Sequence, residues 1–499
     1  KKEKTEVKNE EIKVDKVDIE WEFLDKRIYK IVDNSGWNFP IHVLNDSTLY
    51  FMNNFEDKTR LYKCNYFGKN EELVHDFGKE VENFKYCPSS QKFYYIDSNY
   101  LYSLEPSSKK VKMVKSSFEY VYDKYLLNKD IFEQVWSKFG SGFYDPDMHG
   151  VDWEKAKKIY GEFTKFAYRP AELSAIVNEM IGDVNASHTG YYPRRDNQAK
   201  HIQRAYGGFI LDTNDFPKRG IRIKKVFQKS KLTQPYGIEA GDILLEVDGE
   251  EVGKGKSIYN TFSNKVGKKI NMKFLSGGET KEIAIKGLSY RENYSMYYDN
   301  WVEERREKVE KLTDGEIGYL HIRSMNNSSY ERFLEDLFAE NYDKKALIID
   351  VRNNPGGYIH DRLVEVLTKT SYAKTAPRSA GGRKYKTPGR VWEKPIVLLI
   401  NENSFSDAEI FPNLFKELHL GKVIGMPTSG SVIGTGQVRF MDGSSMRMPS
   451  NGWYSLEDEN MEGSGVEPDI YVEPTPKQVI EDYDVQLQRA VEELYKELN

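Results

Sequence analysis

Three short stretches of the sequence contain residue types that together could perform acyl-transfer chemistry. Ser406 lies between an apolar run and a helix-forming run, in the segment NENSFSDAEIF. Gly356 and Gly357 end the segment DVRNNPGG, and paired glycines let backbone N–H groups approach a ligand without hindrance, as an oxyanion hole requires. His188, in the segment NASHTG, is the candidate base, because a serine hydroxyl becomes strongly nucleophilic only when a neighbouring group accepts its proton.

The residues alone leave the role of Ser406 open. On the residues alone, a serine at this place is better suited to cap the helix that begins near Asp407 than to act as a nucleophile. A single histidine in a loop is often only a hydrogen-bonded neighbour, so His188 does not decide between the two interpretations. Ser404 is a rival nucleophile, although it lies nearer to the end of the preceding strand.

The elements that must position these residues form an alternating pattern of strands and helices from residue 293 onward. We expect strands at 318–322, 346–351, 396–400 and 423–424, with helices at 329–339 and 363–367. The run 346–351 is almost entirely apolar, as expected for a strand that is covered on both faces. In open α/β sheets ligands bind beyond the carboxyl ends of the strands, so the Gly356–Gly357 loop and the Ser406 loop should meet at one edge.

The rest of the chain divides by its sequence texture into further segments. Helical periodicity from Pro170 to Gly182 places the His188 loop beside a packed helix end. Short aromatic strands in the N-terminal region recur at a spacing near forty residues, which is typical of propeller blades, although an ordinary β-meander is the alternative. The predicted organisation is a charged linker at 1–30, propeller-blade-like strands at 31–115, a helical subdomain carrying Ser187 and His188 at 116–200, a small β-rich domain at 201–292, an α/β core at 293–475 and a C-terminal helix at 476–499.

Composition excludes several classes of function. The 499 residues carry a net charge of −5 with no concentrated basic face, which argues against a nucleic-acid partner. No apolar run approaches the length of a membrane span and no signal peptide is visible, so we expect no membrane insertion and a cytoplasmic location, or a periplasmic one if a leader has been removed. Two cysteines and eight histidines without ligand spacing predict neither a metal site nor a cofactor.

The segment GIEAGDILLEVDG at 237–249 resembles a PDZ domain of the kind associated with proteases. Its carboxylate-binding loop and groove strand would be the upstream segment YGGFI, with Gly207, Gly208, Phe209 and Ile210 as the peptide-binding residues. Such a groove binds an extended peptide as an added strand. A PDZ-shaped spacer that binds nothing is the alternative.

Four segments taken together resemble the C-terminal-processing and tricorn peptidase superfamily: DVRNNPGG, NENSFSDAEIF, GVEPDI and DVQLQRA. The order of helical segment, PDZ domain and α/β core behind propeller-like strands resembles the tricorn branch. The fold class that this implies is multidomain α+β, with a crotonase-like α/β catalytic core, a helical subdomain, an inserted PDZ domain and partial propeller-like strands at the N-terminus.

The two branches of the superfamily differ in the base that activates the serine. The processing branch uses a lysine in a T-x-GKG segment, but the matching stretch here is TSGSV, with Ser431 in the lysine's place. The tricorn branch uses a serine, a Ser-His pair and a glutamate. The residues that match, in the family's order, are Ser187, His188, Ser406 and Glu462, and the resemblance implies an oxyanion hole from the N–H groups of Asp407 and of Gly356 or Gly357.

The resemblance therefore implies a serine peptidase that cleaves unfolded proteins or oligopeptides without a cofactor, and that assembles as a homo-oligomer, a hexamer in the family. The loop 370–386 carries several basic residues and no acid, which weakens the case for a basic cleavage preference. Two alternatives are an inactive PDZ-based scaffold that binds peptides and a crotonase-like acyl-CoA enzyme.

Overall fold

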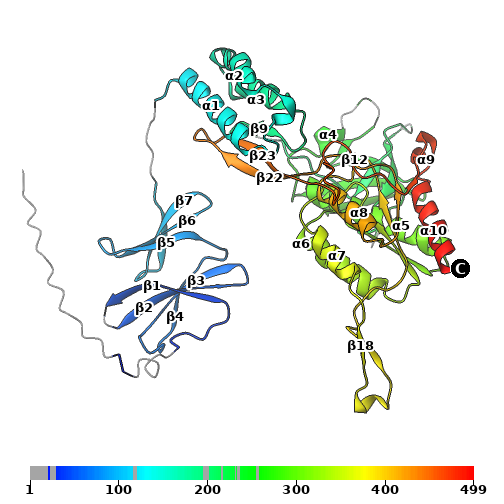
Figure 1. Ribbon diagram of the computed structural model, residues 1–499, viewed down its shortest axis with the longest axis horizontal. Helices are drawn as coiled ribbons and strands as arrows, with labels where there is room; N and C mark the ends of the chain where they lie inside the picture. The colour runs from blue at the N-terminus through cyan, green and yellow to red at the C-terminus, as the bar shows by residue number, and fades with distance from the viewer. Residues whose placement is uncertain are drawn as a thin grey trace, which may run out of the picture. The chain divides into compact units, whose positions relative to one another are not determined.

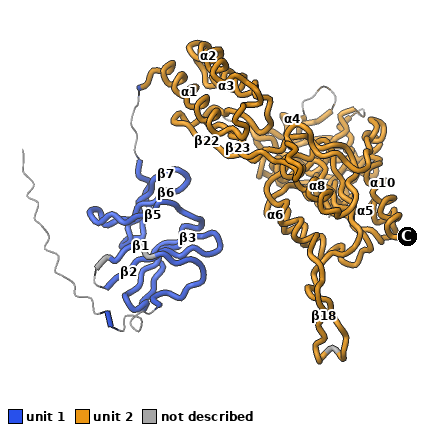
Figure 2. The backbone as a smooth tube through the Cα atoms, in the orientation of Figure 1, with its two compact units in different colours: residues 1–121 blue, residues 122–499 orange. Residues whose placement is uncertain are grey.

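The structure is a computed structural model that describes residues 21–22, 30–45, 47–115, 121–194, 202–214, 217, 219–230, 232, 236–253, 255 and 258–499. The chain divides into two compact units, residues 1–121 and residues 122–499 (Figure 2), which are considered separately. Most of the predicted linker at 1–30 falls outside the described residues.

The first unit consists of two four-stranded antiparallel sheets, each built from consecutive strands. The first sheet contains β1 (Trp37–Asn45), β2 (Thr48–Phe55), β3 (Lys58–Cys64) and β4 (Glu72–Asp76); the second contains β5 (Glu82–Cys87), β6 (Lys92–Asp97), β7 (Tyr100–Glu105) and β8 (Lys110–Met113). Tyr50 and Leu61 of the first sheet share a buried cluster with Phe93 and Leu104 of the second. The aromatic side chains that give this region its texture are therefore the core of the unit.

The second unit begins with three helices, α1 (Lys124–Gly142), α2 (Trp153–Gly161) and α3 (Pro170–Gly182). Asp152 starts α2 by accepting a hydrogen bond from the Lys155 N–H at 2.9 Å, and Pro170 occupies the first turn of α3, where no N–H donor is needed.

A three-stranded sheet packs on these helices. It has the order β22 (Ile433–Arg439), β23 (Ser445–Gly452), β9 (Gly190–Tyr192), and Met446 and Met448 of β23 are buried in the helical core. Residues 433–452, which the sequence assigns to the α/β core, thus pack on the helical segment, because their alternating apolar side chains face α1 and α3.

The predicted PDZ region forms a six-stranded sheet with the main order β10-β11-β12-β14-β15. Its elements are β10 (Phe209–Leu211), β11 (Ile221–Val226), β12 (Ile243–Val247), β13 (Glu250–Glu251), α4 (Ile258–Thr261), β14 (Lys269–Ser276) and β15 (Glu279–Lys286). The tight turn between β12 and β13 contains Gly249 at φ 81°, a conformation that glycine adopts without strain.

The centre of the second unit is a five-stranded parallel sheet (Figure 1). Its strands, in order across the sheet, are β16 (Ile317–His321), β17 (Ala346–Asp350), β20 (Ile396–Ile400), β21 (Lys422–Gly425) and β24 (Ile470–Tyr471). Every residue of the first three strands is buried, as the nearly continuous apolar runs predict.

Helices cover both faces of this sheet. One face packs on α6 (Asn327–Glu335), α7 (His360–Leu367) and α8 (Asp407–Glu417), and the other packs on α5 (Tyr290–Leu312) and α10 (Val485–Leu498). A π-helical turn, Asp336–Glu340, continues α6, and α9 (Pro476–Ile480) precedes α10. Among the helices in the described parts of the chain, none has the 18-residue apolar stretch that a membrane crossing requires.

Two elements of this unit have no clear sequence signal. Helix α5 lacks an apolar stripe because much of its surface binds polar groups of the PDZ sheet: Asn300 Oδ1 accepts the Gln228 N–H at 3.0 Å, and Glu304 pairs with Lys225 at 2.5 Å. The basic loop predicted at 370–386 forms a hairpin, β18 (Ala373–Thr375) and β19 (Tyr385–Thr387), that projects from the sheet (Figure 1).

A buried ion network holds the carboxyl end of β17 against α10. The guanidinium of Arg352 binds the carboxylate of Asp350 at 2.6 Å and that of Asp484 at 2.9 Å, and it also donates to Gln486 Oε1 at 3.0 Å. Asp350 is fully buried, and Arg352 keeps its pKa below the ordinary value in spite of burial, which acts in the opposite direction. Burial also raises the pKa of Asp484, but the charge and hydrogen bonds of Arg352 outweigh burial. The net pKa of Asp484 is about 2.

We expect Arg352→Leu to destabilise the second unit by roughly 3–5 kcal/mol, because it leaves Asp350 buried without a cation and leaves Asp484 with only Arg305, at 3.4 Å. Arg489→Leu is the matched control: Arg489 pairs with Glu493 on the exposed side of α10, where an ion pair contributes at most about 1 kcal/mol. Denaturant unfolding followed by tryptophan fluorescence measures both changes.

The pH dependence of unfolding provides a second check on the network. The folded pKa values of the two carboxylates lie below their unfolded values, so their stabilisation is complete above about pH 4 and is lost as the pH falls toward 2. Arg352→Leu should remove this acid-dependent part of the free energy of unfolding. Equal losses of stability in Arg352→Leu and Arg489→Leu would contradict the role given to the buried network.

Candidate active site

Ser406 lies at a strained turn between β20 and α8. Its backbone has φ 58° and ψ −119°, a conformation that costs a residue other than glycine roughly 1–3 kcal/mol. The strain turns the hydroxyl away from its own helix, so Oγ bonds His188 instead of capping α8. The rival serine, Ser404, is fully buried and its Oγ donates to the Val351 carbonyl at 2.9 Å, which gives it a structural role between the two loops.

His188 approaches Ser406 from the segment between α3 and β9. Its Nε2 lies 3.0 Å from Ser406 Oγ, and its ring stacks on Phe405 with a centroid separation of 4.7 Å. The imidazole is only 7% exposed. The structure therefore brings together two side chains that are 218 positions apart in the sequence, and packing holds the ring in line with the hydroxyl.

Ser187 and Glu462 lie behind the imidazole in a continuous hydrogen-bonded chain. Ser187 Oγ is 2.8 Å from His188 Nδ1 and donates to Glu462 Oε2 at 3.0 Å. The Ser187 N–H also donates to Glu462 Oε1 at 2.6 Å, and the Val432 N–H donates to Oε2 at 2.8 Å. All four residues of the expected catalytic set are thus in contact, in the order Ser406, His188, Ser187, Glu462.

The single hydroxyl proton of Ser187 determines the tautomer of the histidine. A carboxylate can only accept, so Ser187 Oγ uses its proton toward Glu462 and must accept from the Nδ1–H of His188. His188 Nε2 then carries the lone pair and can accept the Ser406 proton. Burial lowers the pKa of His188 to about 4, with a smaller contribution from the positive charge of Arg447, so the ring is neutral at pH 7.

Two backbone N–H groups beside Ser406 have no hydrogen-bond partner among the described residues: those of Asp407 and Gly357. The Gly356 N–H, in contrast, donates to Asn354 Oδ1 at 2.9 Å. Of the two glycines, Gly357 is therefore the one with a free donor. Gly356 has a steric role, because a Cβ there would lie 2.7 Å from the Ser406 Cβ.

The side chain of Asp407, which sequence reasoning did not consider, links the nucleophile turn to α7. Its Oδ2 accepts the Ile359 N–H at 2.7 Å and the His360 N–H at 3.3 Å, and its Oδ1 bonds His360 Nδ1. Burial lowers the pKa of His360, but the hydrogen bond and charge of Asp407 outweigh burial, and the net pKa is raised. The chain following Gly357 is thus fastened to the residue that follows Ser406.

Glu409 is the main residue that sequence reasoning missed. It is fully buried, and its carboxylate accepts five hydrogen bonds, from the Ser406, Gly430 and Ser431 N–H groups and the Thr428 and Ser429 hydroxyls, at 2.6–3.1 Å. Its position three residues after Ser406 signals only a helix cap. The fold instead uses it to hold the segment 428–431 against the nucleophile turn.

The predicted peptide-binding residues of the PDZ region lie on and before β10, and no described hydrogen bond joins them to the Ser406 site. Gly207 and Phe209 line a separate cavity of about 210 Å³ next to α4, whereas Ile210 is not part of its lining, as alternation along a strand requires. The Gly208 N–H donates to Asn293 Oδ1 of α5 at 3.2 Å. In the described residues no group of three or more His, Cys, Asp or Glu side chains is arranged to hold a metal ion.

Comparison with protein families assigns three parts of the chain. Residues 128–182 match the tricorn protease C1 domain, residues 224–289 the tricorn protease PDZ domain and residues 316–472 peptidase family S41. The order of the three matches follows the order of the helical segment, the PDZ sheet and the parallel sheet.

Individual relatives extend these matches. A putative tricorn-like protease C-terminal subunit of Sulfurisphaera tokodaii is 29% identical over 93% of this chain and 53% of its own length. A putative tricorn protease homolog 2 of Streptomyces coelicolor is 31% identical over 67% of this chain and 29% of its own length. The crystal structure of the tricorn protease superposes with a TM-score of 0.79 at 22% identity, covering 91% of this chain and 46% of that one, and so shares its fold.

The chain spans between 29% and 53% of the length of these curated relatives. The chain therefore carries a tricorn protease C1 domain, a tricorn protease PDZ domain and a peptidase family S41 domain, it is similar to relatives named as tricorn proteases, and it shares the tricorn protease fold.

Proposed function

We propose that this chain is a serine peptidase that cleaves peptide bonds of unfolded proteins or oligopeptides through Ser406, His188, Ser187 and Glu462. The observation that carries the proposal is the unbroken hydrogen-bonded chain from Ser406 Oγ to the Glu462 carboxylate, with steps of 3.0, 2.8 and 3.0 Å. The direction of each hydrogen bond in the chain follows from the Glu462 carboxylate, which can only accept. His188 Nε2 is therefore left unprotonated and faces Ser406 Oγ.

The mechanism follows from this geometry. Ser406 Oγ attacks the scissile carbonyl carbon while His188 Nε2 takes the hydroxyl proton. The negative charge that develops on the carbonyl oxygen is stabilised by the N–H groups of Asp407 and Gly357, and the first turn of α8 adds a favourable dipole. The imidazolium, supported by Ser187 and Glu462, then donates its Nε2 proton to the leaving amine, and water hydrolyses the acyl-enzyme by the same steps in reverse.

Two competing functions fit less well. The comparisons give no support to an inactive PDZ scaffold, and a scaffold would gain nothing from the strained backbone at Ser406. A crotonase-like acyl-CoA enzyme would share the oxyanion hole but has no use for the Ser406–His188 pair.

We also propose identities for the parallel sheet and the N-terminal sheets, and an oligomeric state. The layered parallel sheet would be a crotonase-like core, the two N-terminal sheets would be blades of a partial propeller, and the chain would assemble as a homo-oligomer, a hexamer by family resemblance. The tricorn-type fold supports these assignments.

Labelling with a fluorophosphonate probe tests the nucleophile. The wild type should be labelled at Ser406, whereas Ser406→Ala should lose labelling and peptidase activity, and His188→Ala should lose at least about 10³-fold in kcat, because the base is removed. Ser404→Ala is the matched control and should keep both. Mass spectrometry identifies the labelled peptide, and full activity in both Ser406→Ala and His188→Ala would exclude the proposed role.

The pH profile tests the base. Because His188 must be neutral to accept a proton and its pKa is about 4, kcat/KM should remain high below pH 6 and fall only as the pH drops through about 4. Arg447→Gln removes a positive charge that disfavours the imidazolium, so it should raise this pKa and move the acid limb to higher pH. Arg439→Gln, an exposed arginine on β22, should leave the limb unchanged; circular dichroism confirms folding at each pH.

A substitution of Glu409 tests its role in positioning the nucleophile turn. Glu409→Gln places an amide NH₂ against N–H and O–H donors, so at least two of the five hydrogen bonds are lost in either orientation of the amide. We expect a fall in kcat of about tenfold or more with little change in KM, together with a lower melting temperature. Glu417→Gln, at the exposed end of α8, is the control, and an unchanged kcat in Glu409→Gln would contradict this role.

A further inference from the structure

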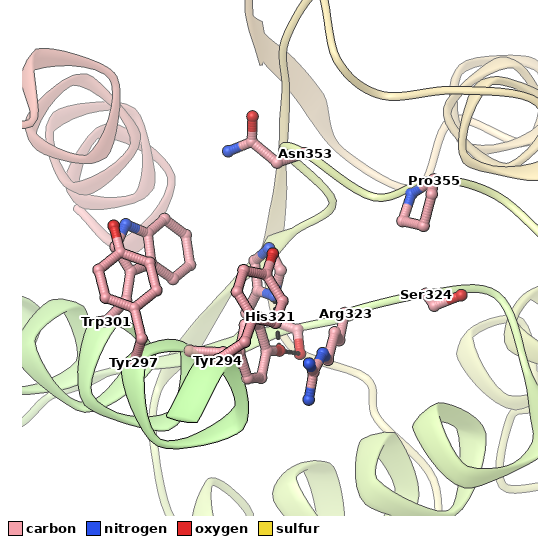
Figure 3. Close-up of a pocket in the computed structure, with 9 residues that line it drawn as sticks. Tyr294, Tyr297, Trp301, His321, Arg323, Ser324, Asn353 and Pro355 are labelled. Carbon is pink, nitrogen blue, oxygen red and sulfur yellow. Dashed lines mark hydrogen bonds between the residues drawn. The ribbon is translucent and has the colours of Figure 1, made fainter. Parts of the chain in front are cut away.

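A cavity of about 520 Å³ opens beside the oxyanion loop and is lined in part by Asn353 and Pro355 of that loop (Figure 3). One wall consists of the aromatic side chains of Tyr294, Tyr297, Tyr298 and Trp301 from α5. Figure 3 shows Asn353 and Pro355, from the loop after β17, across from these rings. The floor contains His321, Arg323 and Ser324, where β16 ends.

The cavity is connected directly to the catalytic residues. Ser324 Oγ donates to the Gly356 carbonyl at 3.0 Å, and Gly356 packs against Ser406 and Asp407. Asn353 bonds the Asn401 side chain at 3.1 Å, in the loop that leads to Ser406. A ligand in the cavity would therefore touch the same loop that provides the oxyanion donor.

The lining carries one uncompensated charge. The guanidinium of Arg323 lies 4.5 Å from the Tyr298 ring centroid and 5.4 Å from that of Tyr294, and it donates to Ser295 Oγ at 3.1 Å. No carboxylate among the described residues forms an ion pair with it, and none lines the cavity. An arginine held in this way retains donors for a planar anion.

The other charged groups near the cavity are already neutralised. The carboxylates whose charge reaches Tyr298 each have a basic partner: Asp299 with Lys229, Asp336 with Arg332, and Asp350 with Arg352. Burial lowers the pKa of His321, which favours the neutral ring; its Nε2 donates to the Arg352 carbonyl at 2.9 Å and its Nδ1 lies 2.8 Å from the Tyr298 hydroxyl. Arg323 therefore sets the sign of the local potential, and it favours a negative occupant.

The position of the cavity indicates which part of a substrate reaches it. The leaving amine must lie near His188, whereas the cavity adjoins the loop that carries the Gly357 N–H, so we place the acyl part of a peptide toward the cavity. Along the carboxyl edge of the sheet, β16 is two strands from β20, about 10 Å at the usual strand spacing, which an extended chain covers in about three residues.

We propose that this cavity is a specificity site for an acidic side chain of the substrate, about three residues from the scissile bond on the acyl side, with its carboxylate on Arg323 and its methylene groups against the tyrosine rings. This inference rests on the proposed peptidase function. The site would give the enzyme a preference for acidic substrates. The hairpin β18–β19 is basic and contains no acid, so it would not repel such a substrate.

Binding to the Ser406→Ala protein tests the site apart from catalysis. Fluorescence anisotropy is measured with N-terminally labelled, C-terminally amidated peptides in which one glutamate is moved along an alanine–serine background, each paired with its glutamine counterpart. We expect one register in which the glutamate peptide binds about tenfold more tightly, an advantage that weakens with salt. Amidation removes the terminal carboxylate, so a preference that appears only with free-acid peptides would overturn the side-chain assignment.

Two arginine variants isolate the cavity. Arg323→Met in the same background should abolish the glutamate preference. Arg362→Met should keep it, since Arg362 has a similar environment elsewhere: its guanidinium lies 3.7 Å from the Tyr330 ring centroid and donates to Asn327 Oδ1 at 2.8 Å. A glutamate preference that survives Arg323→Met would overturn the proposal.

Hydrolysis by the wild type separates this inference from the proposed function. If the wild type cleaves, the glutamate peptide of the favoured register should have the higher kcat/KM, and the Arg323→Met enzyme should cleave both members of the pair equally. If no peptide is cleaved while the Arg323-dependent preference persists in binding, the peptidase function fails and the acidic-peptide site stands. Cleavage without any glutamate preference overturns the site and leaves the peptidase function intact.

Discussion

One hydroxyl proton, that of Ser187, controls the chemistry of the Ser406 site. Ser187 Oγ lies between an acceptor-only carboxylate and an imidazole nitrogen, and it has a single proton to donate. Because Ser187 donates that proton in a hydrogen bond to Glu462, His188 must be protonated on Nδ1 and basic on Nε2. If Glu462 were absent, the hydroxyl could donate to Nδ1, and the proton on Nε2 would then face Ser406.

The fold maintains this polarity by fixing both ends of the chain to backbone groups. Glu462 accepts the N–H groups of Ser187 and Val432, which holds the helical subdomain against the start of β22. At the other end, the strained backbone of Ser406 is retained because Glu409 accepts its N–H and Phe405 packs under His188. The strain at Ser406 is thus offset by contacts that also define the site.

The sequence predicted the parallel sheet well, because buried parallel strands are continuous apolar runs with few alternatives. The runs at 346–351 and 396–400 agree with β17 and β20 to within a residue. The sequence pattern of residues 433–452 did not predict that they pack on the helical segment, since an alternating strand shows that one face is buried without showing against what. Helix α5 gave no stripe because it binds both the PDZ sheet and the parallel sheet, so the wall of the Arg323 cavity had no sequence signal.

Some of the site residues could likewise be found from the sequence, and others could not. Ser406 and the glycine pair stand out because each follows a buried strand, and His188 was a candidate base from the sequence itself. Ser187 and Glu462 required the family resemblance, since no local pattern joins positions 275 residues apart. Between Gly356 and Gly357 only the structure discriminates, because the Asn354 side chain occupies one N–H and leaves the other free. Asp407 and Glu409 looked like ordinary first-turn acids, and apart from Ser406 their partners lie 19 to 48 residues away.

Glu409 also bears on why the proposed base is a histidine and not a lysine. Its buried carboxylate contacts the N–H of Ser431, at the position that matches the lysine of the processing branch. A lysine side chain there would start beside a desolvated negative charge, which would stabilise the ammonium form and raise its pKa far above neutrality. A lysine base must instead lose its proton near neutral pH. The carboxylate that orders residues 428–431 would therefore disfavour a lysine base at this position, in keeping with the proposal that the His188 imidazole accepts the proton.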